Sequence, residues 1–150
     1  MTNTNPTEIA KKFYSLVEQK QLDAAFALLS DDLVVKGPAP KQLGKAEYTA
    51  VHTAWGKACS DWRFNCTRAE LTGDGKVATT IAITATLDGD LVGLPVPGLP
   101  ARIAPTGRRA KLPEERPVMT IQNGKIVALE FVTEPGGGIP GLLSQFGITK

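Results

Sequence analysis

The sequence predicts an α+β domain in which N-terminal helices cover one face of an antiparallel sheet. In the first sixty residues, apolar side chains recur every three or four positions, as they do on one face of a helix. After Asp61 they alternate with polar side chains, and turn sequences containing glycine separate the alternating runs. Helices followed by a meander of strands are typical of α+β domains. The 150 residues suffice for one such domain, which we expect to span residues 1–150.

Three helices and a short strand are expected before Asp61. Thr7 is a candidate N-cap for a helix over about 7–19, and a shorter helical pattern covers 21–29. A short strand over 33–35 ends at Gly37-Pro38, because proline lacks a backbone donor and restricts the residue before it. A third helix over about 45–59 carries several large side chains on one face: Tyr48, Val51, His52 and Trp55.

Four longer strands are expected after Asp61. The alternation at 62–67 predicts the first strand, which the turn at 73–75 joins to a second strand over 76–87. Strands over 110–121 and 126–133 are joined by Asn123-Gly124. The proline- and glycine-rich stretch 88–107 predicts a long loop or a broken excursion, and a second such stretch, 134–141, ends the last strand. The apolar tail 142–147 is expected to cover another surface.

Composition and charge exclude several classes of protein. The chain has 17 Lys and Arg against 15 Asp and Glu, so no overall field favours nucleic acid or an anionic membrane. No secretory leader and no apolar run of about 18 residues are found. Cys59 and Cys66 lack a CxxC spacing and are expected to be reduced thiols in a cytoplasmic protein. The mixed charges at 108–116 indicate a solvated strand face.

Three stretches in order resemble the SnoaL-like polyketide cyclases, within the nuclear transport factor 2-like superfamily that also holds ketosteroid isomerase and limonene epoxide hydrolase. They are Ile-Ala-Pro-Thr-Gly-Arg-Arg at 103–109, Asn-Gly-Lys-Ile-Val at 123–127 and Gly-Leu-Leu-Ser-Gln-Phe-Gly at 141–147. The resemblance implies a cystatin-like curved sheet wrapped around the N-terminal helices. Such a cone holds a mostly apolar internal pocket and is often a homodimer. The two glycine- and proline-rich stretches would border its mouth.

The last strand offers candidate carboxylates. The resemblance places Glu134 where relatives carry a carboxylate in the pocket. The relatives have an aspartate at this position, and this chain has a glutamate. A carboxylate at the rim of an apolar pocket can act as general base or acid near neutral pH. Strand parity points Glu130 the same way, as a candidate substrate contact. The alternatives are a solvated glutamate at the end of a strand for Glu134 and an ion pair for Glu130.

Three further residues are candidates for catalysis. Asp88 is the candidate second carboxylate beside Glu134, or else an ordinary turn aspartate. The histidine and the arginine that relatives carry near this position are missing here. His52, the single histidine, is a candidate general base or hydrogen-bond donor, with packing as the alternative. Tyr14 is a candidate hydroxyl donor, with core packing as its alternative.

The pocket walls and cofactors can also be predicted. Four large side chains are expected in the interior, as core or as ligand wall: Trp55, Trp62, Phe64 and Met119. A single histidine with few other ligands nearby does not predict a metal site, and no nucleotide-binding loop or serine-hydrolase motif is present, so no cofactor is expected.

The leading hypothesis is a small homodimeric enzyme acting on an apolar polyketide-, terpenoid- or steroid-like molecule without a cofactor. Glu134 would move a proton while Tyr14 or His52 stabilises the developing oxyanion. Cyclisation or isomerisation is the expected reaction, with epoxide opening as the nearest variant. The alternatives are a non-catalytic protein of the same fold that binds a hydrophobic ligand, and a dimeric accessory subunit of another enzyme.

Overall fold

The computed structural model describes residues 5–37, 42–73, 75–94, 100–131 and 138–148. The described part contains four helices: α1 (Pro6–Glu18), α2 (Leu22–Phe26), α3 (Lys45–Ala58) and α4 (Gly138–Phe146). The first three confirm the predicted helices, although α2 is shorter than expected. The cap of α1 is Asn5, whose Oδ1 accepts a hydrogen bond from the Thr7 backbone N–H at 3.0 Å. Pro6 follows in the first turn, where its missing N–H does no harm.

The strands form one main sheet and two short ladders. Their bounds are β1 (Leu29–Lys36), β2 (Arg68–Gly73), β3 (Lys76–Thr80), β4 (Thr84–Thr86), β5 (Leu91–Val92), β6 (Arg102–Ile103), β7 (Arg109–Lys111), β8 (Val118–Gln122) and β9 (Lys125–Glu130). The main sheet has the order β1-β9-β8-β3-β2, while β4 pairs with β7 and β5 with β6. The α+β class is therefore confirmed, with one difference: β1 and β9 run parallel in a sheet whose other pairs are antiparallel.

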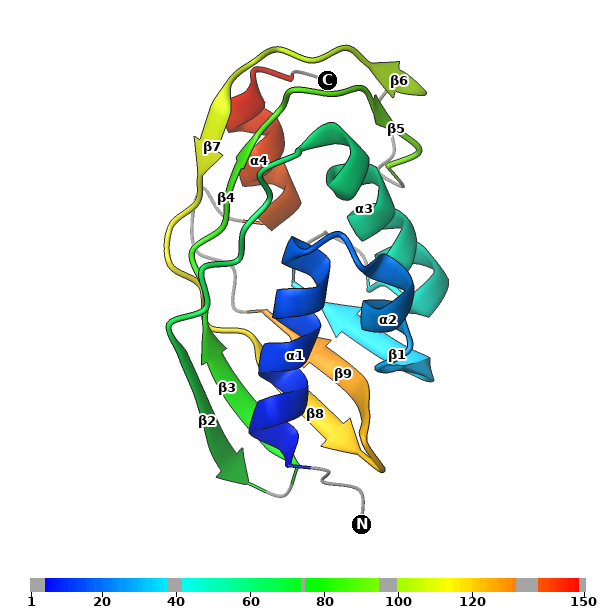
Figure 1. The fold of residues 1–150 in the computed structure, drawn as a ribbon, viewed down its shortest axis with the longest axis vertical. Helices are drawn as coiled ribbons and strands as arrows, with labels where there is room; N and C mark the ends of the chain where they lie inside the picture. Colours follow the sequence, from blue (N-terminus) through cyan, green and yellow to red (C-terminus); the bar gives the residue numbers. More distant parts are fainter. Residues whose placement is uncertain (1–4, 38–41, 74, 95–99, 132–137, 149–150) are drawn as a thin grey trace.

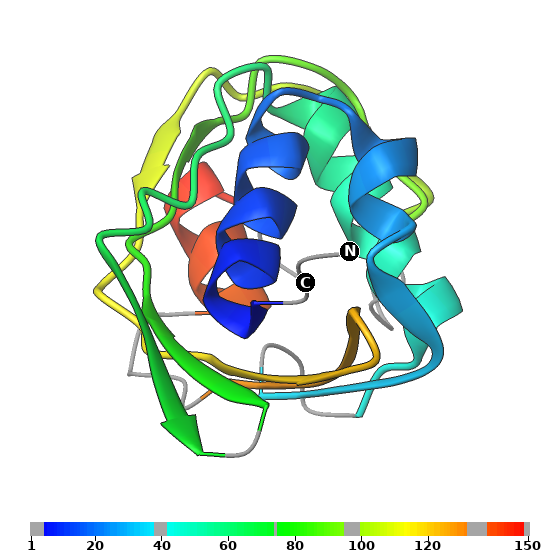
Figure 2. The same ribbon diagram turned by 60° about the horizontal axis from the view of Figure 1, so that its bottom comes forward.

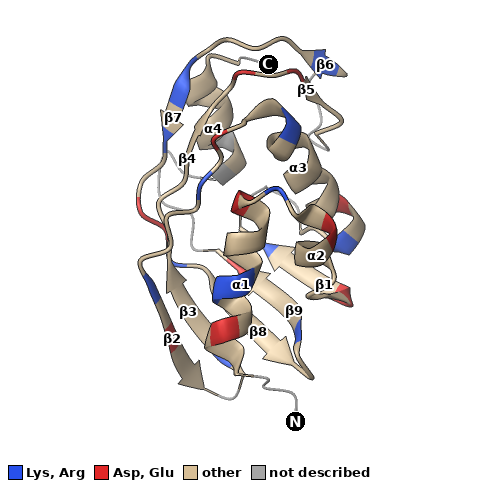
Figure 3. Ribbon diagram, in the orientation of Figure 1, with Lys and Arg blue, Asp and Glu red and all other residues tan. Residues whose placement is uncertain are grey.

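The sheet curves around α1. Figures 1 and 2 show α1 inside the concave side of the sheet, with α2 and α3 beside it and α4 at the far end. The concave face carries the core, including Val35 of β1, Val77 of β3, Met119 of β8 and Leu129 of β9, all of which are buried. The positions of Lys, Arg, Asp and Glu are spread over several elements of the ribbon (Figure 3). The curved sheet wrapped around N-terminal helices is thus as expected.

One long antiparallel ladder connects the two ends of the molecule. The chain rises through β3 and β4 and returns through β7 and β8, with an isolated bridge between Ile81 and Glu115 at the bend. The segment continuing beyond β4 holds the two-residue strands β5 and β6 and is anchored at its start, where the backbone N–H groups of Asp88 and Gly89 bond the Ala58 carbonyl at 3.0 and 2.9 Å. This confirms the expected broken excursion.

Two local predictions have contrasting outcomes. The Asn123-Gly124 turn joins β8 to β9 as expected, and both residues have positive φ, 53° and 76°, as the tight turn of a hairpin requires. The first of the four predicted strands begins later than expected: β2 covers Arg68–Gly73 and pairs with β3, whereas 62–67 forms only an isolated bridge from Arg63 to Thr84. Asn65, with φ of 52°, breaks the extended conformation. The burial of Trp62 and Phe64 nevertheless follows the expected alternation.

The apolar tail folds as α4. Its buried side chains include Ile139, Leu142, Leu143 and Phe146, and the helix packs against β7. The Phe146 ring lies 5.8 Å from that of Trp55 on α3, measured between ring centroids. The expectation that this tail covers an apolar surface is confirmed.

Candidate active site

An apolar cavity lies between α3, α4 and the bend of the long ladder. Its volume, taken as the space open to the centre of a water-sized molecule, is about 40 Å³. Most of its walls are aliphatic or aromatic; the lining residues are Leu43, Tyr48, Val51, His52, Trp55, Trp62, Phe64, Ile83, Glu115, Phe131, Ile139 and Leu142. The predicted wall residues Trp55, Trp62 and Phe64 thus meet here, together with His52.

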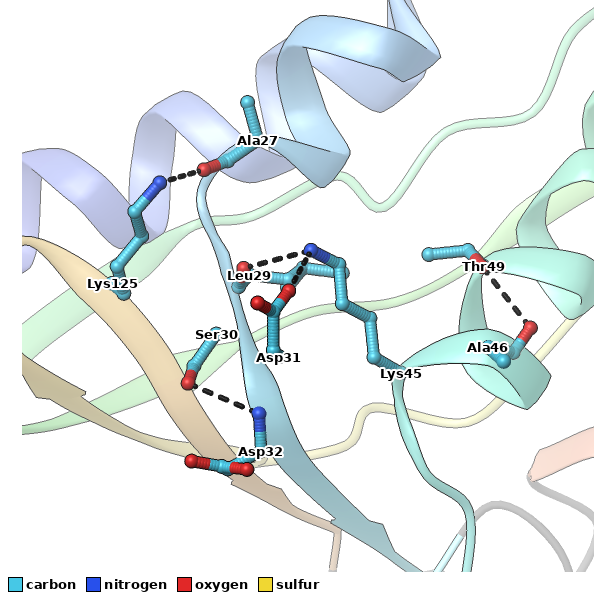
Figure 4. Close-up of polar contacts among 9 residues, drawn as sticks. All are labelled: Ala27, Leu29, Ser30, Asp31, Asp32, Lys45, Ala46, Thr49 and Lys125. Atoms are coloured by element: carbon cyan, nitrogen blue, oxygen red, sulfur yellow. Dashed lines mark hydrogen bonds and ion pairs between the residues drawn. The ribbon is translucent and has the colours of Figure 1, made fainter.

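Helix α3 supplies one wall because of its residue spacing. Tyr48, His52 and Trp55 follow one another at intervals of four and three, which places them on one face. The helix is tied to β1 at its start by Lys45, whose Nζ donates to the Leu29 carbonyl and to Asp31 Oδ1, both at 3.2 Å (Figure 4). Lys125 of β9 likewise donates to the Ala27 carbonyl just after α2.

The opposite wall comes from the irregular segment that holds Trp62 and Phe64. Glu18, at the end of α1, accepts a hydrogen bond from the Phe64 backbone N–H at 2.8 Å. Asp61 accepts from the backbone N–H and the hydroxyl of Thr86, at 2.6 and 2.7 Å. Two carboxylates therefore help to fix a segment whose strand pairing, among the described residues, is limited to the bridge from Arg63 to Thr84.

His52 is buried among aromatic rings. Its ring centroid lies 4.7 Å from that of Tyr48, 5.6 Å from Phe64 and 5.8 Å from Trp62. Burial lowers the pKa of His52 to about 4, because the charged imidazolium loses its hydration. The side chain is neutral at pH 7 and presents one N–H and one lone pair.

Three buried polar atoms on the cavity walls make no hydrogen bond within the described residues. They are the Tyr48 hydroxyl, Nδ1 of His52 and Nε1 of Trp62. Leaving a buried polar group unpaired costs about 1–3 kcal/mol, so native proteins rarely do so without a functional reason. Burial also raises the pKa of Tyr48 well above its ordinary value, so its hydroxyl keeps the proton and remains a donor.

Glu115 brings a carboxyl group to the same cavity, which the sequence reasoning missed. The side chain is 2% exposed, so the solvated face expected over 108–116 is wrong at this position. The register explains why: Thr84 pairs with Lys111 but Ile81 with Glu115, which leaves one extra residue on the returning strand. Such a bulge reverses the direction of the side chains that follow it. Two prolines in the predicted strand, Pro113 and Pro117, were the available signal.

Tyr14 is buried, but its hydroxyl is already engaged. It lies 2.9 Å from Thr79 Oγ1, and Thr79 donates its single hydroxyl proton to the Pro117 carbonyl at 3.0 Å. Thr79 Oγ1 must therefore accept the hydrogen bond that the Tyr14 hydroxyl donates. Burial raises the Tyr14 pKa above its ordinary value. The geometry matches the packing alternative and does not place this hydroxyl on the cavity wall.

Asp88 lies away from the cavity on the surface. Its carboxylate accepts hydrogen bonds from the hydroxyl and the backbone N–H of Ser60, the latter at 3.1 Å. The hydrogen bond from the Ser60 hydroxyl lowers the pKa of Asp88 most, and the bond from the Ser60 backbone N–H lowers it further, so this pKa lies below its ordinary value. The site therefore does not include Asp88, whose geometry is that of the turn aspartate considered above.

The remaining predicted residues divide into three cases. Glu130 is exposed, because the register of β8 and β9 shifts near Ile126, so the assumed strict alternation does not continue to Glu130. Met119 is buried in the sheet between Val77 and Leu129 and does not line the cavity. Glu134 lies outside the described residues.

The described residues contain no group of three His, Cys, Asp or Glu side chains placed to hold a metal ion. No helix among them is long and apolar enough to cross a membrane.

An α+β cone that encloses an apolar cavity between a curved sheet and its helices defines a protein of the nuclear transport factor 2-like class. The chain belongs to the SnoaL-like family, whose domain model matches residues 10–129. None of the curated proteins resembles the sequence closely enough to count as a match.

Solved structures share this fold at low sequence identity. A candidate hydroxylase from Streptomyces galilaeus, AclR, is 20% identical with a TM-score of 0.71, and the match covers 95% of each chain. A candidate polyketide cyclase from Pseudomonas putida is 18% identical with a TM-score of 0.67, over 95% of this chain and 98% of the other. An epoxide hydrolase of the limonene type from M. tuberculosis is 14% identical with a TM-score of 0.67, over 93% and 90%. At these identities the likeness establishes the fold alone.

Proposed function

We propose that the protein is an enzyme that binds an apolar, oxygen-bearing small molecule in this cavity and transforms it by acid–base chemistry without a cofactor. The observation that carries the proposal is the set of three buried polar atoms, on Tyr48, His52 and Trp62, that have no hydrogen-bond partner among the described residues and lie in mostly apolar walls. A ligand oxygen that accepts their hydrogen bonds would recover the free energy lost in burying them.

The family and its neighbours narrow the reaction class. Membership of the SnoaL-like family, with candidate polyketide cyclases among the similar structures, supports cyclisation or isomerisation of a polyketide-, terpenoid- or steroid-like molecule. The epoxide hydrolase among the similar structures supports epoxide opening as the nearest variant. All three reactions develop negative charge on an oxygen atom, which buried hydrogen-bond donors stabilise.

Binding can be measured with the protein's own fluorescence. Both tryptophans of the chain, Trp55 and Trp62, line the cavity, so quenching of their emission reports on this site. A panel of aromatic ketones, terpenoid ketones and epoxides is titrated and then assayed for turnover. Binding with turnover supports an enzyme, binding without turnover for the whole panel favours a non-catalytic ligand-binding protein, and no binding removes the proposal.

Glu134 remains the carboxylate that the family resemblance proposes for moving the proton. Its test is the substitution Glu134→Gln, assayed with whichever member of the panel turns over. Loss of turnover with unchanged tryptophan quenching supports the assignment, whereas the wild-type rate excludes Glu134 from the mechanism.

We also propose that two copies pair through the outer face of the main sheet. Val34, Ala128, Thr120, Val118 and Ala78 lie side by side on β1, β9, β8 and β3, opposite the core face, and each is half-buried in the single chain. Burying this strip would remove apolar surface from water. Sedimentation velocity is expected to show a dimer that Val118→Lys dissociates; a wild-type monomer at micromolar concentration would contradict the pairing.

A further inference from the structure

The bulge that precedes Glu115 separates two adjacent glutamates. Glu114 is exposed and forms an ion pair with Arg116 at 3.5 Å. Glu115 is 2% exposed, and no other Asp or Glu among the described residues is buried. Lys111 pairs with Thr84 on one side of the bulge, and Glu115 pairs with Ile81 on the other. The backbone thus directs one carboxyl group into the cavity and its neighbour into solvent.

Glu115 shares the cavity with hydrogen-bond donors. Tyr48 and His52 reach it from α3 and Trp62 from the segment after α3, while Glu115 reaches it from the bend of the ladder. The walls therefore combine one carboxyl group with an O–H and an indole N–H, in surroundings from which apolar side chains exclude most water. General acid–base chemistry on a carbonyl compound needs a proton carrier and donors for the oxyanion, and this cavity holds both.

We propose that Glu115 is a proton-transferring catalytic residue of this cavity, with Tyr48 and Trp62 as donors to the developing oxyanion. The proposal rests on the proposed function and supplies the second carboxyl group that the sequence analysis assigned to Asp88. The substrate class is a ketone with an acidic C–H next to its carbonyl group, held between the aromatic walls.

The proton transfer balances without a co-reactant. The Glu115 carboxylate takes the proton from the carbon next to the carbonyl, and the electrons of the broken C–H bond form the C=C bond of an enolate. The carbonyl π electrons move to oxygen, which accepts hydrogen bonds from the Tyr48 hydroxyl and the Trp62 N–H. Return of a proton to the same carbon restores the ketone, and return to another conjugated carbon gives an isomer.

Hydrogen exchange of a simple ketone tests this step. The probe is β-tetralone, a bicyclic aromatic ketone, incubated with the protein in D2O while NMR follows loss of its acidic C–H signals. Wild-type protein is expected to accelerate exchange over buffer. Glu115→Gln is expected to slow the catalysed exchange about 100-fold or more, the contribution typical of a general base, with the Kd from tryptophan quenching changed less than about threefold.

The neighbouring residue provides a matched control. Glu114→Gln removes the same charge one residue away, on the solvent side of the bulge, and is expected to exchange at the wild-type rate. Glu115→Met replaces the carboxyl group by an apolar group of similar length that suits the cavity walls. It keeps the test valid should the amide of Glu115→Gln disturb folding, which circular dichroism melting checks.

Each outcome decides between defined alternatives. Exchange lost in both Glu115 variants but kept in Glu114→Gln supports the proposal. Exchange at the wild-type rate in a folded Glu115 variant overturns the role of Glu115 while the proposed function stands. If the wild-type protein does not accelerate the exchange of β-tetralone, the role of Glu115 is overturned, whereas the proposed function is decided separately by the panel titration.

Discussion

Two buried tyrosines, Tyr14 on α1 and Tyr48 on α3, both pack against Phe13 but have different polar environments. The ring of Phe13 is 6.0 Å from that of Tyr14 and 6.4 Å from that of Tyr48. The Tyr14 hydroxyl is part of a hydrogen-bonded chain that ends at the Pro117 carbonyl. The Tyr48 hydroxyl has no hydrogen-bond partner within the described part of the chain.

The difference separates a buried hydroxyl that supports the packing of the core from one that a ligand in the cavity can use. A satisfied buried hydroxyl helps to fix the packing of α1 on β3, whereas an unsatisfied one lowers stability unless a ligand pairs with it. Burial alone, which is similar for both tyrosines, does not distinguish these roles. Four substitutions or titrations sharpen the comparison, in order of expected effect.

Phe13→Ala is expected to give the largest loss of stability, because Phe13 is fully buried and its ring contacts both tyrosines. Removing a buried phenylalanine ring lowers the free energy of unfolding by roughly 3–5 kcal/mol. Urea unfolding measures the loss, with Lys12→Ala at the exposed neighbouring position of α1 as control. A loss of less than about 1 kcal/mol would contradict the tight packing of Phe13 against the two tyrosines.

Stability is expected to fall as the pH is lowered through the His52 titration. The pKa is 6.5 in the unfolded chain and about 4 in the folded one, so the unfolded state binds more protons between these values. The stabilisation is complete above pH 6.5 and decreases by up to roughly 3 kcal/mol as the pH falls towards 4.

A variant isolates the histidine from other groups facing the cavity. Tyr48, Trp62 and Glu115 face the same space, and Glu115 is the carboxyl group among them. His52→Phe keeps a ring and removes the imidazole. The change with pH in the difference between its unfolding free energy and that of the wild type is therefore the contribution of the His52 titration. An unchanged pH dependence in His52→Phe would contradict the assigned burial.

Tyr14→Phe is expected to lower the free energy of unfolding by about 1–2 kcal/mol, since Thr79 Oγ1 loses the proton it accepts. Tryptophan quenching by a cavity ligand should stay at the wild-type value, because this hydroxyl does not line the cavity. Weakened ligand binding in the variant would place Tyr14 in the site after all.

Tyr48→Phe is expected to change stability least, within about 0.5 kcal/mol, or to raise it, because the hydroxyl removed has no partner to lose among the described residues. Ligand binding should weaken instead, which tryptophan quenching detects. Equal stability losses in Tyr48→Phe and Tyr14→Phe would remove the distinction between the two hydroxyl groups.

Structural features that depend on a short-range repeat of apolar residues, or on a turn sequence, were predictable from the sequence. The spacing of apolar side chains placed α1 and α3 within one or two residues, and Asn123-Gly124 marked its hairpin. The face shared by Tyr48, His52 and Trp55 followed from helical geometry. These features depend on neighbours within about four positions in the chain, so the sequence carries them without knowledge of the fold.

The tertiary structure decided which residues belong to the candidate site. Register shifts in the ladders leave Glu130 exposed and direct Glu115 inward, and both interrupt a strict alternation that strand parity assumes. Whether a buried hydroxyl has a partner depends on residues far away in the chain, such as Thr79 for Tyr14, 65 positions apart. The sequence by itself determined the class of fold and one wall of the cavity, because local periodicity encodes which face is apolar. Only the folded chain decided which polar groups face the cavity, because strand register and long-range pairing are set by packing as a whole.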